Sequence, residues 1–316
     1  MNPAPGIVGF AYAAMAQGRL DHLKAMMDAV INAELVFMVP ILRALVIMYV
    51  GMQFFLFMYG LLTVERLITS CIRPLVVVFL IMHSGAFAQW VRDPIFTKIP
   101  AAISSTILAS VGVDATSSMG PARQFDQVAL KMDAITARTL ELNTSWSATS
   151  IGNSLAAQIA NMAAQTLLGM IAGVWMCGTT LLAILLCFGP ILLVFELFDR
   201  TRHLVESWIT KCVGILAFGM GTSILLALQM QEMTDLLNGI HGAMGSNVSE
   251  AVGMLVHVCA NMVLDLLTMI ALPAAVGFGS AAAASLAGPA TMLALRGAPG
   301  IAGAAGQIGK AAASRR

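Results

Sequence analysis

Five polar side chains recur along the last apolar segment of the chain. They are separated by seven, four, four and three residues: Glu250, His257, Asn261, Asp265 and Thr268. On a helix this spacing places all of them on one face. Ionisable groups are costly at membrane depth and usually face the protein interior or water. This polar stripe could therefore line an aqueous lumen or a proton path, or it could form hydrogen bonds to neighbouring helices, and the sequence leaves both readings open.

The signatures of soluble enzymes are absent from the sequence. The five histidines show no metal-ligand spacing such as H-E-x-x-H, and there is no G-x-x-x-x-G-K-[ST] loop. A G-x-S-x-G nucleophile turn is also missing. We therefore predict that the chain is not an enzyme, has no catalytic or metal site, and binds no cofactor.

The elements that carry these residues are membrane helices. Charged residues make up only 10% of the chain, against roughly 25% in soluble domains, and the mean hydropathy is +0.86. Apolar stretches long enough to cross a bilayer are residues 44–62, 74–90, 166–188, 212–230 and 251–279. We predict an all-α polytopic integral membrane protein with about five transmembrane helices and a long helical periplasmic loop.

This reading divides the chain into five parts. They are an amino-terminal periplasmic segment with an amphipathic helix (1–43), two spans (44–91), a periplasmic helical loop (92–165), three spans (166–279) and an Ala/Gly-rich cytoplasmic tail (280–316). Lysine and arginine favour the cytoplasmic side. The short segment 231–250 contains neither residue, whereas the segment on the other side of the span 212–230 contains Arg200, Arg202 and Lys211. We expect the amino terminus outside and the carboxyl terminus inside.

A corner is predicted after the third span. The chain is uncharged from Thr166 to Phe195 and is interrupted at Gly189–Pro190, where proline obstructs the preceding helical turn. Apolar positions then recur at helical spacing opposite charged ones, at Leu193, Leu197, Thr201, Leu204 and Trp208. This pattern predicts an amphipathic helix in the membrane interface over 189–211, with Trp208 in the aromatic belt.

A second apolar stripe runs through the predicted loop. Its members alternate in steps of three and four residues: Phe125, Val128, Met132, Ile135, Thr139, Leu142 and Trp146. A period of 3.5 is typical of a coiled-coil seam. The seam could pair subunits, or it could belong to an amphipathic helix that packs on the protein's own loop.

The corner carries a family resemblance. In it Gly189–Pro190 closes a span, Phe195 and Phe198 follow, and Thr201–Arg202 precede Trp208. This arrangement resembles a recurring segment of the TrbL/VirB family, the polytopic inner-membrane subunits of bacterial type IV secretion and conjugation machines. The family layout of an outside amino terminus, a long central periplasmic loop and a cytoplasmic carboxyl terminus also matches the predicted topology.

The resemblance implies a non-enzymatic platform or channel subunit of the bacterial inner membrane. Such subunits form homo-oligomers at the base of the stalk or pilus and help to pass DNA, protein substrates and pilin across the membrane. They work with other stalk, pilus and inner-membrane subunits, and separate ATPases supply the energy. The other partner is membrane lipid.

The alternative is a proton-coupled transporter of small solutes that uses Asp265 and His257 as coupling residues. Many such proteins have inverted repeats and paired broken helices. Here one span has a clear internal break, and five spans do not divide into equal halves.

Overall fold

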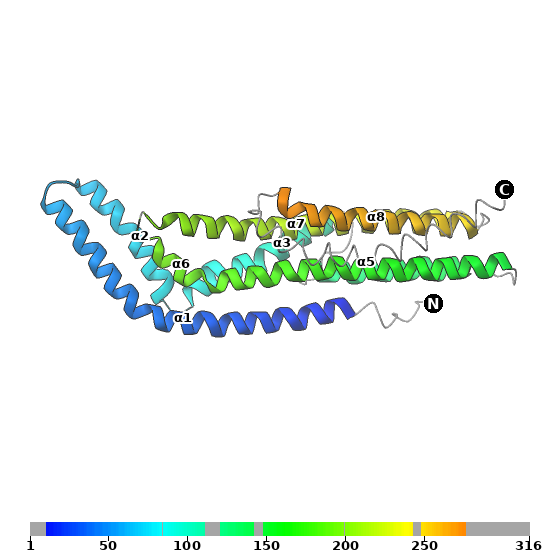
Figure 1. Cartoon of the computed structure of the whole chain (residues 1–316), viewed down its shortest axis with the longest axis horizontal. Coiled ribbons are helices and arrows are strands. Elements are labelled where there is room, and N and C mark those ends of the chain that lie inside the picture. The colour runs from blue at the N-terminus through cyan, green and yellow to red at the C-terminus, as the bar shows by residue number, and fades with distance from the viewer. Residues whose placement is uncertain are drawn as a thin grey trace. The chain divides into compact units, whose positions relative to one another are not determined.

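The computed structural model describes residues 11–83, 85–110, 121–141, 148–198, 200–242 and 248–275, and within these ranges every regular element is a helix (Figure 1). In chain order the elements are α1 (Ala11–Met58), α2 (Val64–Met82), η1 (Ala88–Arg92), η2 (Pro94–Lys98), α3 (Ile99–Ser110), α4 (Pro121–Glu141), α5 (Ala148–Cys187), α6 (Gly189–Phe195), α7 (Arg202–Gly242) and α8 (Val248–Ala275). The prediction of an all-α polytopic membrane protein is confirmed.

Three of the described helices are long and apolar enough to cross a membrane. These stretches are Ala14–Met58 of α1, Ser150–Cys187 of α5 and Arg202–Asp235 of α7. A shorter apolar stretch, Val256–Ala271, belongs to α8. The spans predicted at 166–188 and 212–230 therefore correspond to α5 and α7, and the span predicted at 251–279 corresponds to α8 as far as Ala275, with the rest outside the described residues.

The first helix is longer than predicted. The expected amphipathic helix within residues 1–43 and the span at 44–62 form one continuous helix, α1, with Pro40 inside it. Figure 1 shows a bend in α1, as expected where proline removes a hydrogen bond and obstructs the preceding turn. The helix ends at a turn in which Gly60 has a φ of +71° and its N–H donates to the carbonyl oxygen of Phe57 at 2.9 Å. The 44–62 prediction therefore extends past the helix end.

The span predicted at 74–90 is not a single helix. Helix α2 ends at Met82, and Gly85 has a φ of +83°. Two turns of π-helix, η1 and η2, follow. The guanidinium of Arg92, almost fully buried, forms ion pairs with Asp28 of α1 and with Asp93, so this segment is fixed to α1.

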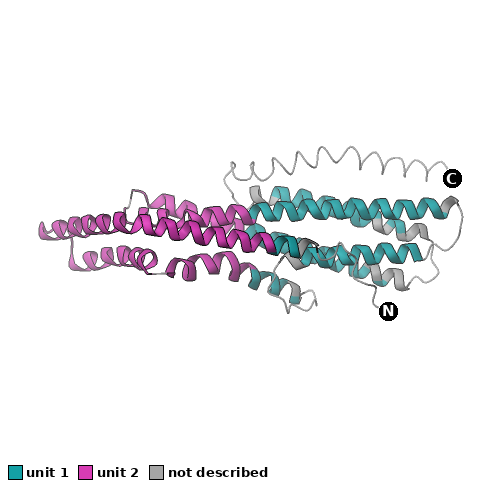
Figure 2. Cartoon of the chain, turned by 90° about the horizontal axis from the view of Figure 1, so that it is seen from below, with its two compact units in different colours: residues 1–17, 101–178, 217–316 teal, residues 18–100, 179–216 magenta. Residues whose placement is uncertain are grey.

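The chain forms two compact units (Figure 2). One comprises residues 18–100 and 179–216, and its core joins α1, α2 and the region of α6. The buried members of this core are Met38, Leu42, Val77, Ile81, Val194 and Leu197. The corner after α5 is thus part of a packed core.

The other unit comprises residues 1–17, 101–178 and 217–316. In its described part, α4 packs with α5, α7 and α8, and Val128, Leu168, Leu226 and Met262 from these four helices line a small common cavity.

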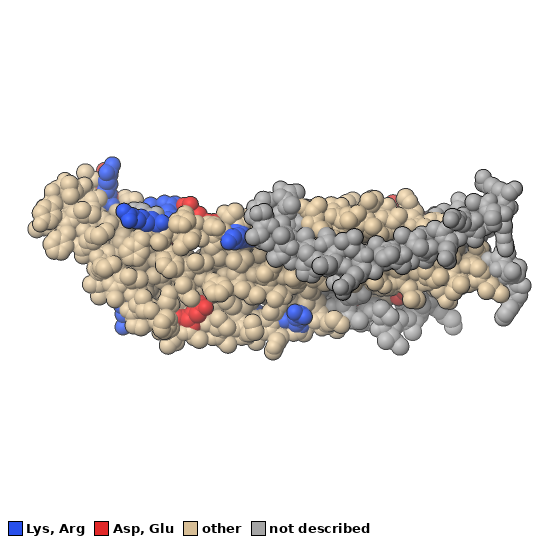
Figure 3. All heavy atoms as spheres, in the orientation of Figure 1, with Lys and Arg blue, Asp and Glu red and all other residues tan. Residues whose placement is uncertain are grey.

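Charged side chains are sparse on the face of the molecule shown in Figure 3. A largely uncharged surface is expected for helices that contact lipid.

Candidate functional site

The corner begins where α5 can no longer continue. Helix α5 ends at Cys187, and Pro190 occupies the first turn of α6. Because proline has no N–H, it cannot donate to the carbonyl four residues earlier. The end of a helix also leaves its last four carbonyl groups without partners inside the helix. The corner must therefore satisfy these groups by other means.

Trp208 of α7 satisfies one of them. Its indole Nε1–H donates to the carbonyl oxygen of Leu185 at 2.8 Å, and the side chain is only 5% exposed. The ring also lies against Gly189, where an added Cβ would be 3.1 Å from Trp208 Cζ2 and 2.5 Å from Phe87 Cζ. Glycine is required here because two aromatic rings close on its backbone. Trp208, Phe87 and Gly189 together hold the start of α7 against the end of α5.

The turn between α6 and α7 is closed by Thr201 and Arg202. The Thr201 hydroxyl lies 2.7 Å from the carbonyl oxygen of Phe195, the last residue of α6, and 3.2 Å from that of Phe198. The Arg202 Nε lies 2.9 Å from Glu206 Oε1 and 3.7 Å from Glu196 Oε1. Both partners of Arg202 are on the corner itself, and its own side chain is 45% exposed.

All seven residues predicted for the corner therefore lie in one region, but its form differs from the prediction. A single interfacial helix over 189–211 is wrong, because α6 ends at Phe195 and α7 begins at Arg202. Trp208 in an aromatic belt is also wrong, because its ring is buried and its N–H is bonded within the protein. The helical spacing was correct only locally, since the turn at 196–201 interrupts it.

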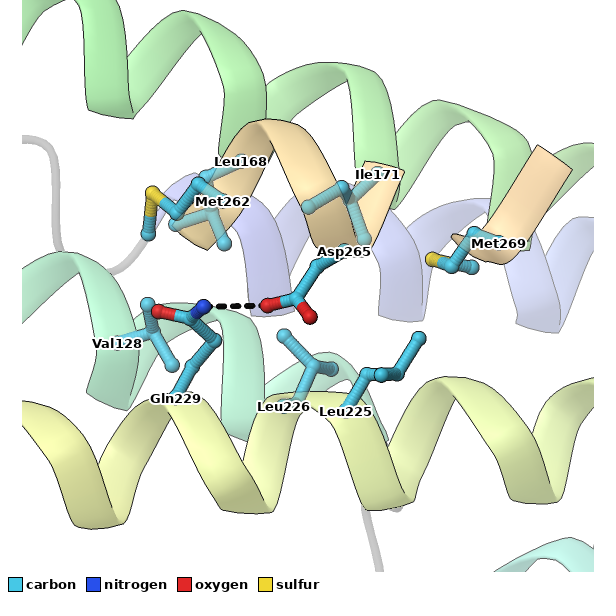
Figure 4. Close-up of a pocket in the computed structure, with 9 residues that line it drawn as sticks. All are labelled: Val128, Leu168, Ile171, Leu225, Leu226, Gln229, Met262, Asp265 and Met269. Atoms are coloured by element: carbon cyan, nitrogen blue, oxygen red, sulfur yellow. Dashed lines mark hydrogen bonds between the residues drawn. The ribbon is translucent and has the colours of Figure 1, made fainter. Parts of the chain in front are cut away.

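A second polar region joins α7 and α8. The Gln229 side-chain amide donates to the carboxylate of Asp265, and Figure 4 shows the two groups pointing toward each other across the small cavity. Asn261 Nδ2 donates to Glu232 Oε2 at 2.9 Å. Each helix thus contributes one amide and one carboxylate. Gln229 is buried and needs a partner, so its bond to Asp265 favours one alignment of α7 and α8. The Asn261–Glu232 pair is exposed and adds less.

The predicted polar stripe of α8 is divided in the structure. Asn261 and Asp265 face α7, whereas His257 and Thr268 are exposed. The side chain of Glu250 lies outside the described residues. His257 and Asp265 are two helical turns apart, and Asp265 bonds to Gln229.

The predicted seam is buried within the chain. Five of its members lie on α4, and each is at most 1% exposed: Phe125, Val128, Met132, Ile135 and Thr139. Leu142 and Trp146 lie outside the described residues. The described seam packs on α5, α7 and α8 of the same chain, and so not only on the predicted loop.

Two charged residues fix α4 among its neighbours. The Lys131 ammonium donates to the Met230 carbonyl oxygen at 3.2 Å and to the Thr234 hydroxyl, both on α7. Burial lowers the pKa of Lys131 from its usual value. On the other side, Asp133 Oδ1 accepts from Asn161 Nδ2 of α5 at 3.2 Å. These contacts give α4 a defined register.

Several residues of both regions were not singled out from the sequence. In the corner they are Phe87 and Leu185, which carry no local signal because one is an ordinary apolar residue and the other acts through its backbone. In the polar region, Gln229 and Glu232 sit at the end of an apolar run three residues apart. That spacing places both on one face of α7 and could have indicated them.

Comparison with known proteins agrees with the corner resemblance. The sequence model of the TrbL/VirB6 plasmid conjugal transfer protein family matches residues 43–272, which include the corner, α4 and most of α8. None of the curated proteins compared with the chain matches it. The family match covers well over half of the sequence. The chain therefore belongs to the TrbL/VirB6 family and is a membrane-associated subunit of a conjugal transfer, or type IV secretion, complex.

Proposed function

We propose that the chain is a homo-oligomeric platform or channel subunit of the bacterial inner membrane. It supports the passage of DNA or protein substrates and the assembly of a pilus, together with stalk, pilus and inner-membrane subunits and separate ATPases. Its amino terminus lies in the periplasm and its carboxyl terminus in the cytoplasm. Support comes from the family match and from the lysine and arginine distribution of the short segments.

The observation that carries this proposal is the construction of the corner. Its interior is closed by the Trp208–Leu185 hydrogen bond and by packing on Gly189. Its outer side is charged, because Arg200, Arg202 and Glu206 are exposed. A rigid turn with a charged outer side is suited to holding a fixed contact with a partner subunit at the membrane surface. The corner is therefore the proposed docking point for the cytoplasmic components.

In this proposal Asp265 has a packing role. Its carboxylate accepts from Gln229 and helps to align α7 with α8. A proton-coupled transporter would instead require Asp265 to titrate during each cycle, since loss of a coupling carboxylate removes the proton step. The two functions thus assign opposite importance to Asp265 and the corner.

Conjugation frequency in a donor strain that depends on this chain separates the two functions. Arg202→Glu should reduce transfer by at least tenfold while the protein remains inserted, because it reverses a charge on the proposed docking side. Arg19→Glu, a charge reversal at another exposed arginine, should have little effect. Asp265→Asn keeps an acceptor for Gln229 and should be largely tolerated. Complete loss of function in Asp265→Asn, with loss of uptake driven by a pH gradient and a mild effect of Arg202→Glu, would refute the platform function.

The orientation has its own test. A reporter that is active only in the periplasm should give signal when fused after Glu141 and none when fused after Arg315. The reverse pattern would invert the proposed topology.

A further inference from the structure

Helix α4 lies beside the apolar parts of α5 and α7, although the sequence placed it in an external loop. The Phe125 ring is 5.9 Å from the ring of Trp175 on α5. Val128 lines the same small cavity as Leu168 of α5 (Figure 4). The span predicted from the sequence for α5 starts at Thr166, and Trp175 lies about 13 Å further along the helix at 1.5 Å per residue. This is nearly half of a hydrocarbon core of about 30 Å.

The register shows which end of α4 is deeper. Asp133 pairs with Asn161, the Ala129 carbonyl oxygen accepts from Gln165 at 3.5 Å, and Phe125 reaches Trp175. The two helices are therefore antiparallel, and earlier residues of α4 lie further along the apolar run of α5. Pro121 precedes Ala129 by eight residues, so the first half of α4 extends about 12 Å past the level of Gln165.

This deeper half of α4 carries polar groups. Gln124 is fully buried, and among the described residues neither atom of its amide has a hydrogen-bond partner. The buried Oε1 of Gln127 also has none in the described part of the chain. The same holds for Asn161 Oδ1 on α5 and Gln229 Oε1 on α7. A buried polar group without a partner costs about 1–3 kcal/mol, and in native proteins ordered water commonly satisfies such groups.

The side of this first half of α4 that faces away from the bundle carries one polar and one apolar side chain. Ala134 and Ala137 are exposed and mark the side of α4 that faces away from the bundle. Seven residues earlier on a helix, the same side carries Gln127 and Leu130, and both are partly exposed. Leu130 suits either lipid or a protein neighbour. The amide of Gln127 does not suit lipid, because it would find no hydrogen-bond partner in hydrocarbon.

We propose that α4 is a re-entrant helix that enters the membrane from the outer surface, and that its first half lines a water-filled recess beside α5 and α7. The recess is polar through Gln124, Gln127 and Gln229. This proposal rests on the proposed function only because it takes α5 and α7 as membrane spans. The recess gives water access from the outer surface to about half the membrane depth.

The test measures two quantities on the full-length protein in right-side-out membranes: the proximity of α4 to α5 and the access of water to Gln127. In a variant without the five native cysteines, Val128→Cys and Leu168→Cys should form a disulfide on mild oxidation. Val128→Cys with Ile151→Cys should not, because Ile151 lies about 25 Å away along α5. Absence of the first disulfide would overturn the insertion of α4.

Water access is measured as the rate at which an introduced cysteine reacts with a charged, membrane-impermeant methanethiosulfonate reagent. Gln127→Cys should react with it at least tenfold faster than Cys177, kept as the single cysteine of a control variant. Cys177 is exposed on the apolar run of α5 and should face lipid. If the disulfide forms but Gln127→Cys reacts no faster than Cys177, lipid or another subunit covers this side of α4 and the recess is refuted. Neither readout depends on substrate transfer, so failure here is distinct from failure of the proposed function.

Discussion

Replacing Trp208 by phenylalanine isolates the hydrogen bond that holds the corner. The substitution keeps an aromatic ring against Gly189 but removes the indole N–H that donates to the Leu185 carbonyl oxygen at 2.8 Å. That carbonyl lies in the last turn of α5, whose final carbonyl groups have no N–H partner within the helix. The variant therefore leaves a partly buried acceptor unsatisfied while most of the packing remains.

The expected loss can be worked out from the geometry. An unsatisfied buried acceptor costs about 1–3 kcal/mol, so Trp208→Phe should destabilise the protein by about 2 kcal/mol. Trp208→Ala also removes the ring that packs on Gly189 and should cost about 3–5 kcal/mol. At roughly 2–4 °C per kcal/mol for a chain of this size class, Trp208→Phe should lower the melting temperature by about 4–8 °C.

Thermal melting of the detergent-solubilised protein, followed by loss of the monodisperse gel-filtration peak, measures this shift. Trp90→Phe is the matched control, because Trp90 belongs to the same compact unit and is 65% exposed. It should change the melting temperature by no more than about 2 °C, as expected for a surface substitution. Equal shifts in Trp208→Phe and Trp90→Phe would show that the indole hydrogen bond does not stabilise the corner.

Two further substitutions test the packing of each unit. Gly189→Ala places a Cβ 2.5 Å from Phe87 Cζ and should destabilise the protein by about 1–3 kcal/mol in the same melting assay. Gly51→Ala on α1 is the control, because no atom lies within 4 Å of its added Cβ. This control variant should be as stable as the unmodified protein or more stable. A Gly189→Ala variant as stable as Gly51→Ala would contradict the close approach. Ile135→Lys puts an ammonium group into the buried face of α4 and should cost more than about 4 kcal/mol, lowering the yield of folded protein, while Ala137→Lys on the exposed side should be tolerated. If Ile135→Lys instead gave a stable protein of smaller oligomeric size, the seam would be a subunit contact after all.

At the corner, local sequence patterns predicted one feature of the structure correctly and another wrongly. Gly189–Pro190 marked the end of α5 correctly, because proline acts on its own helix. The helical spacing through Trp208 predicted one continuous interfacial helix, and this was wrong because Thr201 and the turn before it end α6. Spacing alone could not show that the Trp208 ring turns inward to a carbonyl of α5.

Helix α4 illustrates the same division. Its period of 3.5 predicted a helix with one buried apolar face, and the structure confirms both for the residues it describes. The period is the same whether that face packs on a second subunit or on the chain itself, since either partner only has to be apolar. In the structure, contacts of Lys131 with α7 and of Asp133 with α5 hold α4 against helices of the same chain.

The sequence by itself determined the membrane class, the helical content, the break after α5 and the family, because composition, hydropathy and short-range spacing act locally along the chain. Tertiary structure alone decided that Trp208 bonds to Leu185 and that Asp265 meets Gln229. Each of these depends on which distant segment packs alongside, and the pairing of buried polar groups across helices has no signal in either segment alone.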